Sequence, residues 1–129
     1  MRIIAAVFID TIQLREAPGP STRIDLGGVK FSEVAPSPAP VTVEPHLVVL
    51  VYCPKDHKGE AALEVTYTRD GEQVARNVQP LEVEPGKFNY RLVRAELTFD
   101  DYGTVEASCR IDLGDAVVVP YTLLAPVEG

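Results

Sequence analysis

The stretch that decides the fold is AALEVTYTRDGEQVARNV, residues 61–78. Leu63, Val65 and Tyr67 alternate with polar residues, which is the pattern of a β-strand that buries one face. Asp70-Gly71 follows, a dipeptide that favours the tight turn of a β-hairpin, and a second run returns after it. This stretch therefore predicts an antiparallel hairpin in which one face of the sheet meets a core.

The same organisation continues as far as Leu124. Short alternating runs are separated at regular intervals by turn dipeptides, namely Pro85-Gly86, Tyr102-Gly103 and Gly114-Asp115. No run has helical periodicity, and no linker divides the chain. We therefore expect residues 1–129 to form a single all-β domain, an immunoglobulin-like antiparallel β-sandwich of about seven to nine strands.

Two apolar runs near the start of the chain are expected to lie inside the sandwich. Residues 2–8, with room to continue to Leu14, are apolar on both faces and predict a buried interior strand. Residues 47–53 form a continuous apolar run between Pro45 and Pro54, which predicts a central strand.

Other strands are expected to give one face to the core. Val29, Phe31 and Val34 alternate along one predicted strand and are available to the core. Farther along, the apolar residues change parity between Leu92 and Val93, which predicts a β-bulge there. The last two strands are expected to bury Val105, Ala107, Cys109, Ile111 and Leu113, and Val117, Val119, Tyr121 and Leu123.

Residues 35–40, APSPAP, are the one compositionally biased segment. Three prolines favour an extended path without hydrogen-bond donors, and we interpret the segment as a crossover between sheets. The alternative is a proline-rich ligand for an aromatic-lined groove.

Charge and the N-terminal residues limit the kinds of partner. Nineteen acidic and twelve basic residues give a formal charge of −7, which repels phosphate backbones and argues against nucleic-acid binding. The apolar run before Asp10 is too short to span a bilayer, and no small-residue cleavage site follows a proper hydrophobic region. We therefore expect a soluble cytoplasmic protein without nucleic-acid or membrane partners.

The two cysteines, Cys53 and Cys109, fall on apolar strands. Their spacing resembles the cysteine pair that joins the sheets of immunoglobulin domains, but no Trp follows Cys53, and Ala107 stands where that family has Tyr. Buried free thiols are the expectation in a reducing compartment. A disulfide between the sheets and a metal-binding or reactive role are the alternatives.

Two weak metal patterns are present. Cys53, Asp56 and His57, with His46 upstream, contain the zinc-like spacing Cys-x3-His, but four converging ligands are not evident. Calcium is the second possibility, because carboxylate-rich loops can gather at one end of a sandwich. The candidate ligands are Asp100, Asp101, Asp112 and Asp115, with Asp56 as a further one, although acids in turns usually serve as local caps.

Nucleophilic catalysis finds no support in the sequence. Gly27-Gly28 lacks the spacing of a phosphate-binding loop, and no serine lies in a nucleophile elbow, as a survey of Ser21, Ser32, Ser37 and Ser108 indicates. We therefore expect neither an enzyme nor a cofactor. One basic cluster, interleaved with aromatic residues, is interpreted as a solvated edge or a patch for an acidic partner; it comprises Lys87, Phe88, Tyr90, Arg91 and Arg94.

The whole pattern resembles an uncharacterised family of small bacterial single-domain β-sandwich proteins. The resemblance is carried by Phe8-Ile9-Asp10, Ile24-Asp25-Leu26-Gly27-Gly28, Leu63-x-Val65 before Asp70-Gly71, and Tyr102-Gly103. It implies the same fold and a protein that is not an enzyme, and it assigns no functional residue.

The sequence thus predicts a non-enzymatic binding or assembly module with an unknown protein partner. Exposed sheet edges would serve either self-association into a homo-oligomer or pairing with a partner strand. The alternatives are a structural subunit of a phage particle or similar assembly, such as a decoration or tail component, and a metal-binding sandwich.

Overall fold

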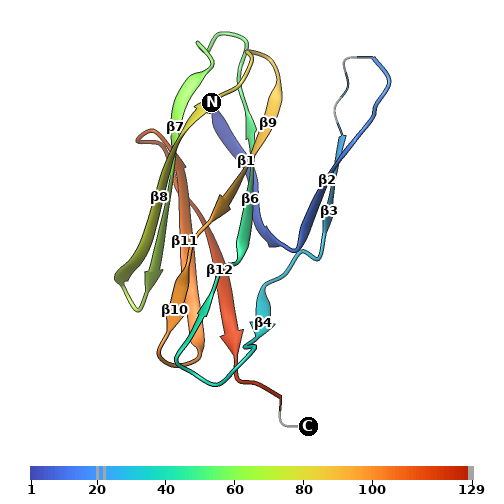
Figure 1. Cartoon of the computed structure of the whole chain (residues 1–129). Coiled ribbons are helices and arrows are strands. Elements are labelled where there is room, and N and C mark those ends of the chain that lie inside the picture. The colour runs from blue at the N-terminus through green and yellow to red at the C-terminus, as the bar shows by residue number, and fades with distance from the viewer. Residues whose placement is uncertain (20, 22, 128–129) are drawn as a thin grey trace.

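A computed structural model describes residues 1–19, 21 and 23–127 of the chain. Twelve strands form in these residues, and no helix is among them. No helix of the described part is therefore long and apolar enough to cross a membrane. The chain is all-β with several sheets, as the sequence predicts, in an arrangement compatible with a β-sandwich (Figure 1). The predicted number of seven to nine strands is too low, because five of the twelve are short strands of three to five residues.

One layer is built on a three-stranded antiparallel sheet. Its strands are β1 (Arg2–Ile9), β6 (His46–Tyr52) and β9 (Phe88–Arg94), in the order β1-β6-β9. The central position of β6 confirms the prediction from its continuous apolar run. A short pair, β5 (Val41–Val43) with β10 (Leu97–Phe99), adds to the core.

The other layer is a five-stranded sheet in the order β4-β12-β11-β7-β8. The predicted hairpin at Asp70-Gly71 is present and joins β7 to β8, and a second hairpin joins β11 to β12. We call the outer face of this sheet the far face. Its strands are β4 (Ser32–Val34), β7 (Glu60–Arg69), β8 (Glu72–Glu82), β11 (Gly103–Ile111) and β12 (Val117–Leu124).

The two layers enclose one apolar core. β1 lies against β11 and β12, and every second residue of the inner strands is buried. Tyr121 is central, with its ring 5.2 Å from that of Phe8 and 6.4 Å from that of Phe99. The predicted inward residues of β7 are fully buried. The largest buried side chains are Tyr67, Tyr121, Phe8, Phe99, Ile9, Leu47, Leu63, Leu81, Leu97 and Leu123.

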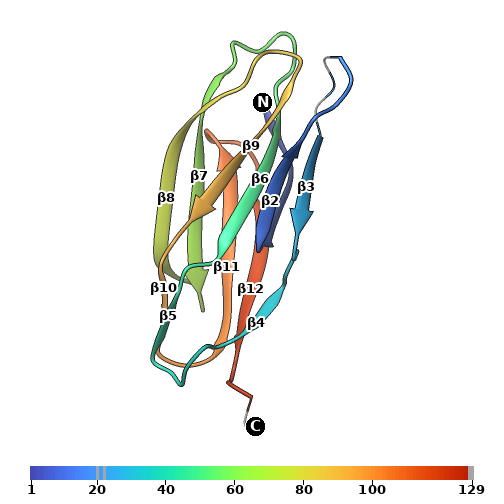
Figure 2. The same cartoon turned by 45° about the vertical axis from the view of Figure 1, so that its right-hand side comes forward.

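A two-stranded hairpin extends from one side of these layers, and we call it the arm. It consists of β2 (Thr11–Arg15) and β3 (Arg23–Gly27), which pair only with each other among the described residues. Figures 1 and 2 show the arm on the side of the molecule opposite to β8. The first strand therefore ends at Ile9 and does not continue to Leu14, because the chain turns at Asp10 into the arm.

Three predictions about the core are wrong, wholly or in part. Val29, Phe31 and Val34 are exposed by 44%, 67% and 44%, because only a short parallel pairing with β12 joins this segment to the sheet. Leu113 lies in the turn between β11 and β12 and is 88% exposed. The prediction for residues 2–8 is wrong in part: Ala6 and Phe8 are buried, but β1 ends the order of its sheet, and Arg2 and Ile4 are exposed.

The predicted bulge near Leu92 and Val93 is wrong as well. The register between β6 and β9 runs without a shift from His46↔Arg94 to Tyr52↔Phe88. Apolar residues occur at both parities of β9 because Val93 enters the core while Leu92 lies on the outer face of the sheet. The change of parity therefore indicates that the outer face of this sheet is apolar as well.

The proline-rich segment 35–40 connects β4 of one sheet to β5 of another, as the crossover interpretation predicts. Ala35 is buried at its start, and its backbone N–H donates a hydrogen bond of 2.9 Å to the Leu124 carbonyl. The Tyr102 hydroxyl accepts a hydrogen bond of 3.0 Å from the Ala39 N–H.

Candidate binding surface

The outer face of the three-stranded sheet is apolar, and we call it the arm face. Leu47, Val49 and Val51 of β6 point into the core, so the residues between them point outward. The strand register places outward residues in three rows across the sheet. These rows are Val7, Val48 and Leu92; Ala5, Leu50 and Tyr90; and Arg2, Tyr52 and Phe88.

The arm has one apolar face of its own. Leu14 is paired with Ile24, and Ile12 with Leu26, and cross-strand partners project from the same side of a hairpin. Arg15 and Arg23, the last pair before the loop of the hairpin, have the opposite parity, yet both also line the groove between the arm and the arm face. The alternation along β2 and β3 thus separates an aliphatic face from a polar one.

A groove of about 910 Å³ lies between the arm and the arm face. Leu14 and Ile24 contribute to it from the arm, and Leu50, Phe88 and Tyr90 from the sheet. A volume of this size is typical of concave binding sites in proteins. The remaining lining residues are Ile4, Arg15, Ser21, Arg23, Gly86, Lys87 and Asn89.

Burial changes along the arm face. Ile9 and Val48 are almost completely buried but do not belong to the core between the layers, so their end of the arm face is covered. Toward the groove the apolar side chains become accessible, with Ile4 47%, Phe88 58% and Leu14 64% exposed. The arm therefore leaves an apolar surface open on the same face that it partly covers.

The base of the arm is fixed by backbone hydrogen bonds. The N–H of Asp10 donates to the carbonyls of Gly27 and Gly28, at 3.0 and 3.2 Å. The N–H of Lys30 donates to the Phe8 carbonyl at 2.9 Å, which joins the end of the arm to β1. Gly28 has a φ of +63°, and a Cβ there would lie 2.7 Å from the Asp10 carboxyl carbon. The turn therefore requires glycine at this position.

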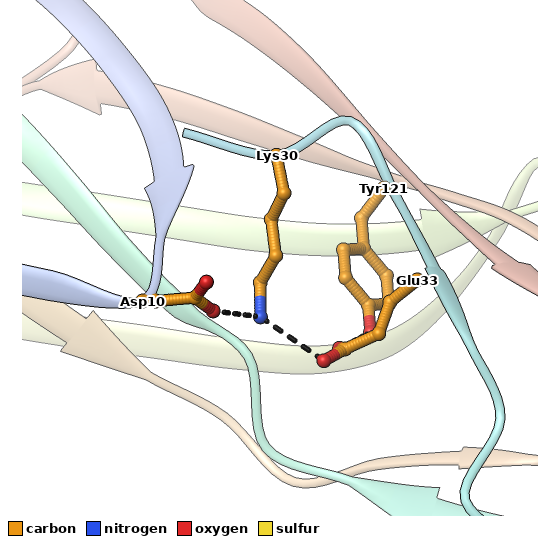
Figure 3. Close-up of polar contacts among 4 residues, drawn as sticks. All are labelled: Asp10, Lys30, Glu33 and Tyr121. Atoms are coloured by element: carbon orange, nitrogen blue, oxygen red, sulfur yellow. Dashed lines mark hydrogen bonds and ion pairs between the residues drawn. The ribbon is translucent and has the colours of Figure 1, made fainter. Parts of the chain in front are cut away.

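A polar network fixes the same base (Figure 3). The Lys30 ammonium donates to Asp10 at 2.8 Å and to Glu33 at 3.2 Å, and the Tyr121 hydroxyl donates to Glu33 at 2.6 Å. Because Tyr121 is buried in the core, the network connects both ends of the arm to the interior. These contacts hold the arm in one orientation over the sheet.

The network also changes two pKa values. Burial raises the pKa of Tyr121, and its hydrogen bond to Glu33 raises it further. Burial alone would lower the pKa of Lys30, but its hydrogen bonds to Asp10 and Glu33 outweigh this effect and raise it. Lys30 therefore stays charged throughout the neutral range.

The groove is lined by cations. Arg15, Arg23 and Lys87 line it, and no carboxylate does so among the described residues. A fourth cation lies on the arm face, where the Arg2 guanidinium is 5.7 Å from the ring centroid of Tyr52. The lining thus carries three cations on a chain whose formal charge is −7, and Asp25 and Glu84 pair with two of them, Arg15 and Lys87.

The basic and aromatic cluster predicted from the sequence is divided by the structure. Lys87, Phe88 and Tyr90 line the groove, whereas Arg91 has the inward parity of Val49 and donates a hydrogen bond from Nη1 to the Tyr90 carbonyl. Arg94 is exposed and does not line the groove. The arm residues of the groove carry no sequence signal of their own, but apolar residues at both parities of residues 2–9 and 88–93 indicate a two-sided strand.

The cysteines are free and buried, as expected. Cys53 follows β6 in one layer, and Cys109 lies on β11 in the other. Burial raises the pKa of the Cys109 thiol to about 12, which keeps it protonated at neutral pH.

The candidate metal ligands do not converge. His57 accepts a hydrogen bond of 2.9 Å at Nδ1 from the Gly59 N–H, so this side chain stabilises its own loop. In the part of the chain that the structure describes, no group of three or more His, Cys, Asp or Glu residues is placed to hold a metal ion, and this includes Cys53, Asp56 and His46.

The aspartates proposed for calcium lie at opposite ends of β11, so the hypothesis that they gather at one end is wrong. Asp101 accepts a hydrogen bond of 2.8 Å from the Tyr102 N–H, and Asp112 accepts one of 2.9 Å from the Ala62 N–H. Asp100 and Asp115 are exposed beside them. The Asp101 contact is a local turn contact, whereas the Asp112 contact joins the end of β11 to β7.

No protein-family model matches the sequence, and no curated protein matches it either.

Proposed function

We propose that this chain is a non-enzymatic binding module and that a protein partner occupies the groove between the arm and the arm face. The observation that carries the proposal is the juxtaposition of Leu14 on the arm with Phe88 on the sheet, both more than half exposed, across one groove. Exposed apolar side chains that are grouped and concave mark interaction sites more often than scattered ones do. The fixed base of the arm supports a preformed site, which reduces the ordering cost of binding.

The fold supports a narrower assignment as well. We propose an immunoglobulin-like sandwich, because two antiparallel layers enclose one core and each layer contributes one of the two cysteines. The free thiols support a reducing compartment such as the cytoplasm. The resemblance to small bacterial sandwich proteins agrees with both proposals.

Assembly into a homo-oligomer is the second candidate, and a specific surface favours it. β8 is eleven residues long, ends the five-stranded sheet, and exposes Val74 and Val78. A long edge strand with apolar side chains is a template for pairing with another strand. A structural subunit of a phage particle or similar assembly would use such an edge.

Two matched double variants test these candidates. Leu14→Asp with Phe88→Asp changes the groove, and Val74→Asp with Val78→Asp changes β8. Each is used as bait for capture from the native host, beside the wild type and a Val118→Asp control on the far face. We expect one defined protein to be retained by every bait except the groove variant. A protein retained equally by all baits would contradict the proposal.

Light scattering after size-exclusion chromatography, over a range of concentrations, separates the candidates further. A monomer in all variants supports the binding module. If the wild type and the groove variant formed a discrete oligomer and the β8 variant did not, the assembly function would be favoured over the binding module.

A further inference from the structure

We propose that the groove binds a peptide segment that carries acidic residues beside bulky apolar ones. This inference rests on the proposed binding function and adds the chemistry of the partner. It follows from the charges that line the groove, from the side chains between them and from the concave shape of the surface.

The charges are the first step. The groove is lined by Arg15, Arg23 and Lys87, on a chain with nineteen acidic and twelve basic residues. Two of these cations are already paired within the chain, Arg15 with Asp25 at 3.1 Å and Lys87 with Glu84 at 2.9 Å. These pairs are exposed to solvent, where a partner's carboxylate can compete. Within the described residues, Arg23 has no carboxylate at ion-pair distance. Such a surface attracts carboxylates, and the acidic remainder of the chain repels acidic partners from other faces.

The apolar side chains are the second step. Ile4, Leu14 and Phe88 are accessible between the cations, and the ring of Phe88 lies 5.1 Å from that of Tyr52. Carboxylates alone would leave this surface exposed to water. A partner that also inserts aliphatic or aromatic side chains would bury it and gain affinity.

The shape of the groove is the third step, and it favours a peptide over an anionic bilayer. Leu14 and Ile24 form one wall on the arm, and Leu50 and Tyr90 form the other on the sheet. These side chains line a recess, whereas a bilayer would need them on a protruding surface. A single chain segment fits between two such walls.

A random-peptide display library panned on the intact protein tests the proposal. Two variants are panned in parallel: Arg23→Glu with Lys87→Glu, which reverses charge in the groove, and Lys58→Glu with Arg94→Glu, which makes the same change outside it. Circular dichroism and the melting temperature establish that each variant is folded. We expect the wild type and the Lys58/Arg94 control to enrich peptides that combine Asp or Glu with Leu, Ile, Phe or Tyr.

An enriched peptide is then resynthesised and its Kd is measured by calorimetry. We expect the Arg23/Lys87 variant to raise the Kd by about tenfold or more and the control to change it by less than about threefold. Added salt should weaken binding to the wild type, because the contributing charges are exposed.

Other outcomes overturn the proposal. The library could instead enrich peptides without acidic residues, and the Leu14→Asp, Phe88→Asp variant could fail to bind them. That result would refute the acidic partner and leave the binding function intact. Failure to enrich any peptide, together with no host protein specific to the groove, would refute both. If the wild type bound phosphatidylglycerol vesicles and the Arg23/Lys87 variant did not, the partner would be a membrane and not a peptide. If the wild type were a dimer and the Leu14/Phe88 variant a monomer, a second copy of the chain would be the occupant of the groove.

Discussion

The arm face and the far face are both outer surfaces of β-sheets, but the middle of the far face is charged, whereas the arm face is mostly apolar. In the middle of the far face, the Glu64 carboxylate accepts hydrogen bonds from Arg76 at 3.0 and 2.5 Å and from Arg110 at 2.7 Å. At the other end of β11, the hydroxyls of Thr104 and Thr122 lie 2.7 Å apart. On the arm face the corresponding rows are aliphatic and aromatic, with the arm above them.

The difference shows what each face is suited to contact. The far face pairs Glu64 with two arginines and exposes valines, such as Val78 and Val118, among polar residues, which is the usual outer face of an antiparallel sheet. The arm face buries Ile9 and Val48 and leaves Leu14 and Phe88 exposed, so its covering is incomplete. Four stability experiments test this difference between the two faces.

The largest effect is expected from the same substitution on the two faces. Val48→Asp places a carboxylate at a fully buried position of the arm face and should lower the free energy of unfolding by about 3 kcal/mol or more. Val118→Asp on the far face, at a position 52% exposed, should change it by less than about 0.5 kcal/mol. Urea unfolding followed by circular dichroism measures both. Equal losses would mean that the two faces are not different environments.

Two glycines with positive φ provide the next comparison. Gly71→Ala, at a φ of +81° in open space, should cost about 1–2 kcal/mol from the left-handed backbone alone. Gly28→Ala, at +63°, should cost about 1 kcal/mol more, because the new Cβ displaces Asp10 and its hydrogen bond to Lys30. Urea unfolding again gives both values. If the Gly28 variant were no less stable than the Gly71 variant, Asp10 would not fix the base of the arm.

Removing the Tyr121 hydroxyl tests the network below the arm. Tyr121→Phe loses the hydrogen bond to Glu33 and should cost about 1 kcal/mol at neutral pH. The raised pKa of Tyr121 means that its contribution is present below the ordinary tyrosine pKa of 10 and is lost as pH rises toward the higher folded value. The wild type should therefore lose its advantage over the variant in alkaline buffer. Tyr52→Phe serves as a control, and a pH-independent difference for Tyr121→Phe would contradict the proposed linkage.

The smallest effect is expected on the far face. Hydrogen bonds from Arg76 and then Arg110 lower the pKa of Glu64, so its stabilisation is present above the ordinary value of 4.5 and is lost as pH falls through the lower folded value. Glu64→Gln should therefore be slightly less stable than the wild type at neutral pH, and the two should converge in acid. Since these charges are solvent-accessible, salt should also reduce the difference. A large effect at neutral pH would show that the far face has a buried network of its own.

Several features of the fold were predictable because they depend on neighbours in sequence. Alternation from Leu63 to Tyr67 and the Asp70-Gly71 turn suffice for the β7–β8 hairpin, and the apolar run before Cys53 indicates a central strand. Both thiols were expected to be buried, since they fall on apolar strands. In each case the residues that decide the structure are local.

The groove is harder to predict from the sequence. Phe88 and Tyr90 belong to the basic and aromatic cluster that the sequence shows, but the change of parity after Leu92 predicts a bulge that the structure does not have. The arm residues Leu14 and Ile24 had no distinguishing pattern, because a short hairpin with one apolar face resembles any other short hairpin.

The all-β class, the main hairpins and the burial of the inner strand faces follow from the sequence alone. Strand periodicity and turn chemistry act over a few residues, and they give the same answer wherever the strand is placed. Apolar residues on both faces of β1 and β6 are also visible in the sequence, but it is the tertiary structure that places the arm across the groove from their outer face. That outcome depends on where the turn at Asp10 and Gly28 directs the arm, and Lys30, Glu33 and Tyr121 stabilise that direction from distant parts of the chain.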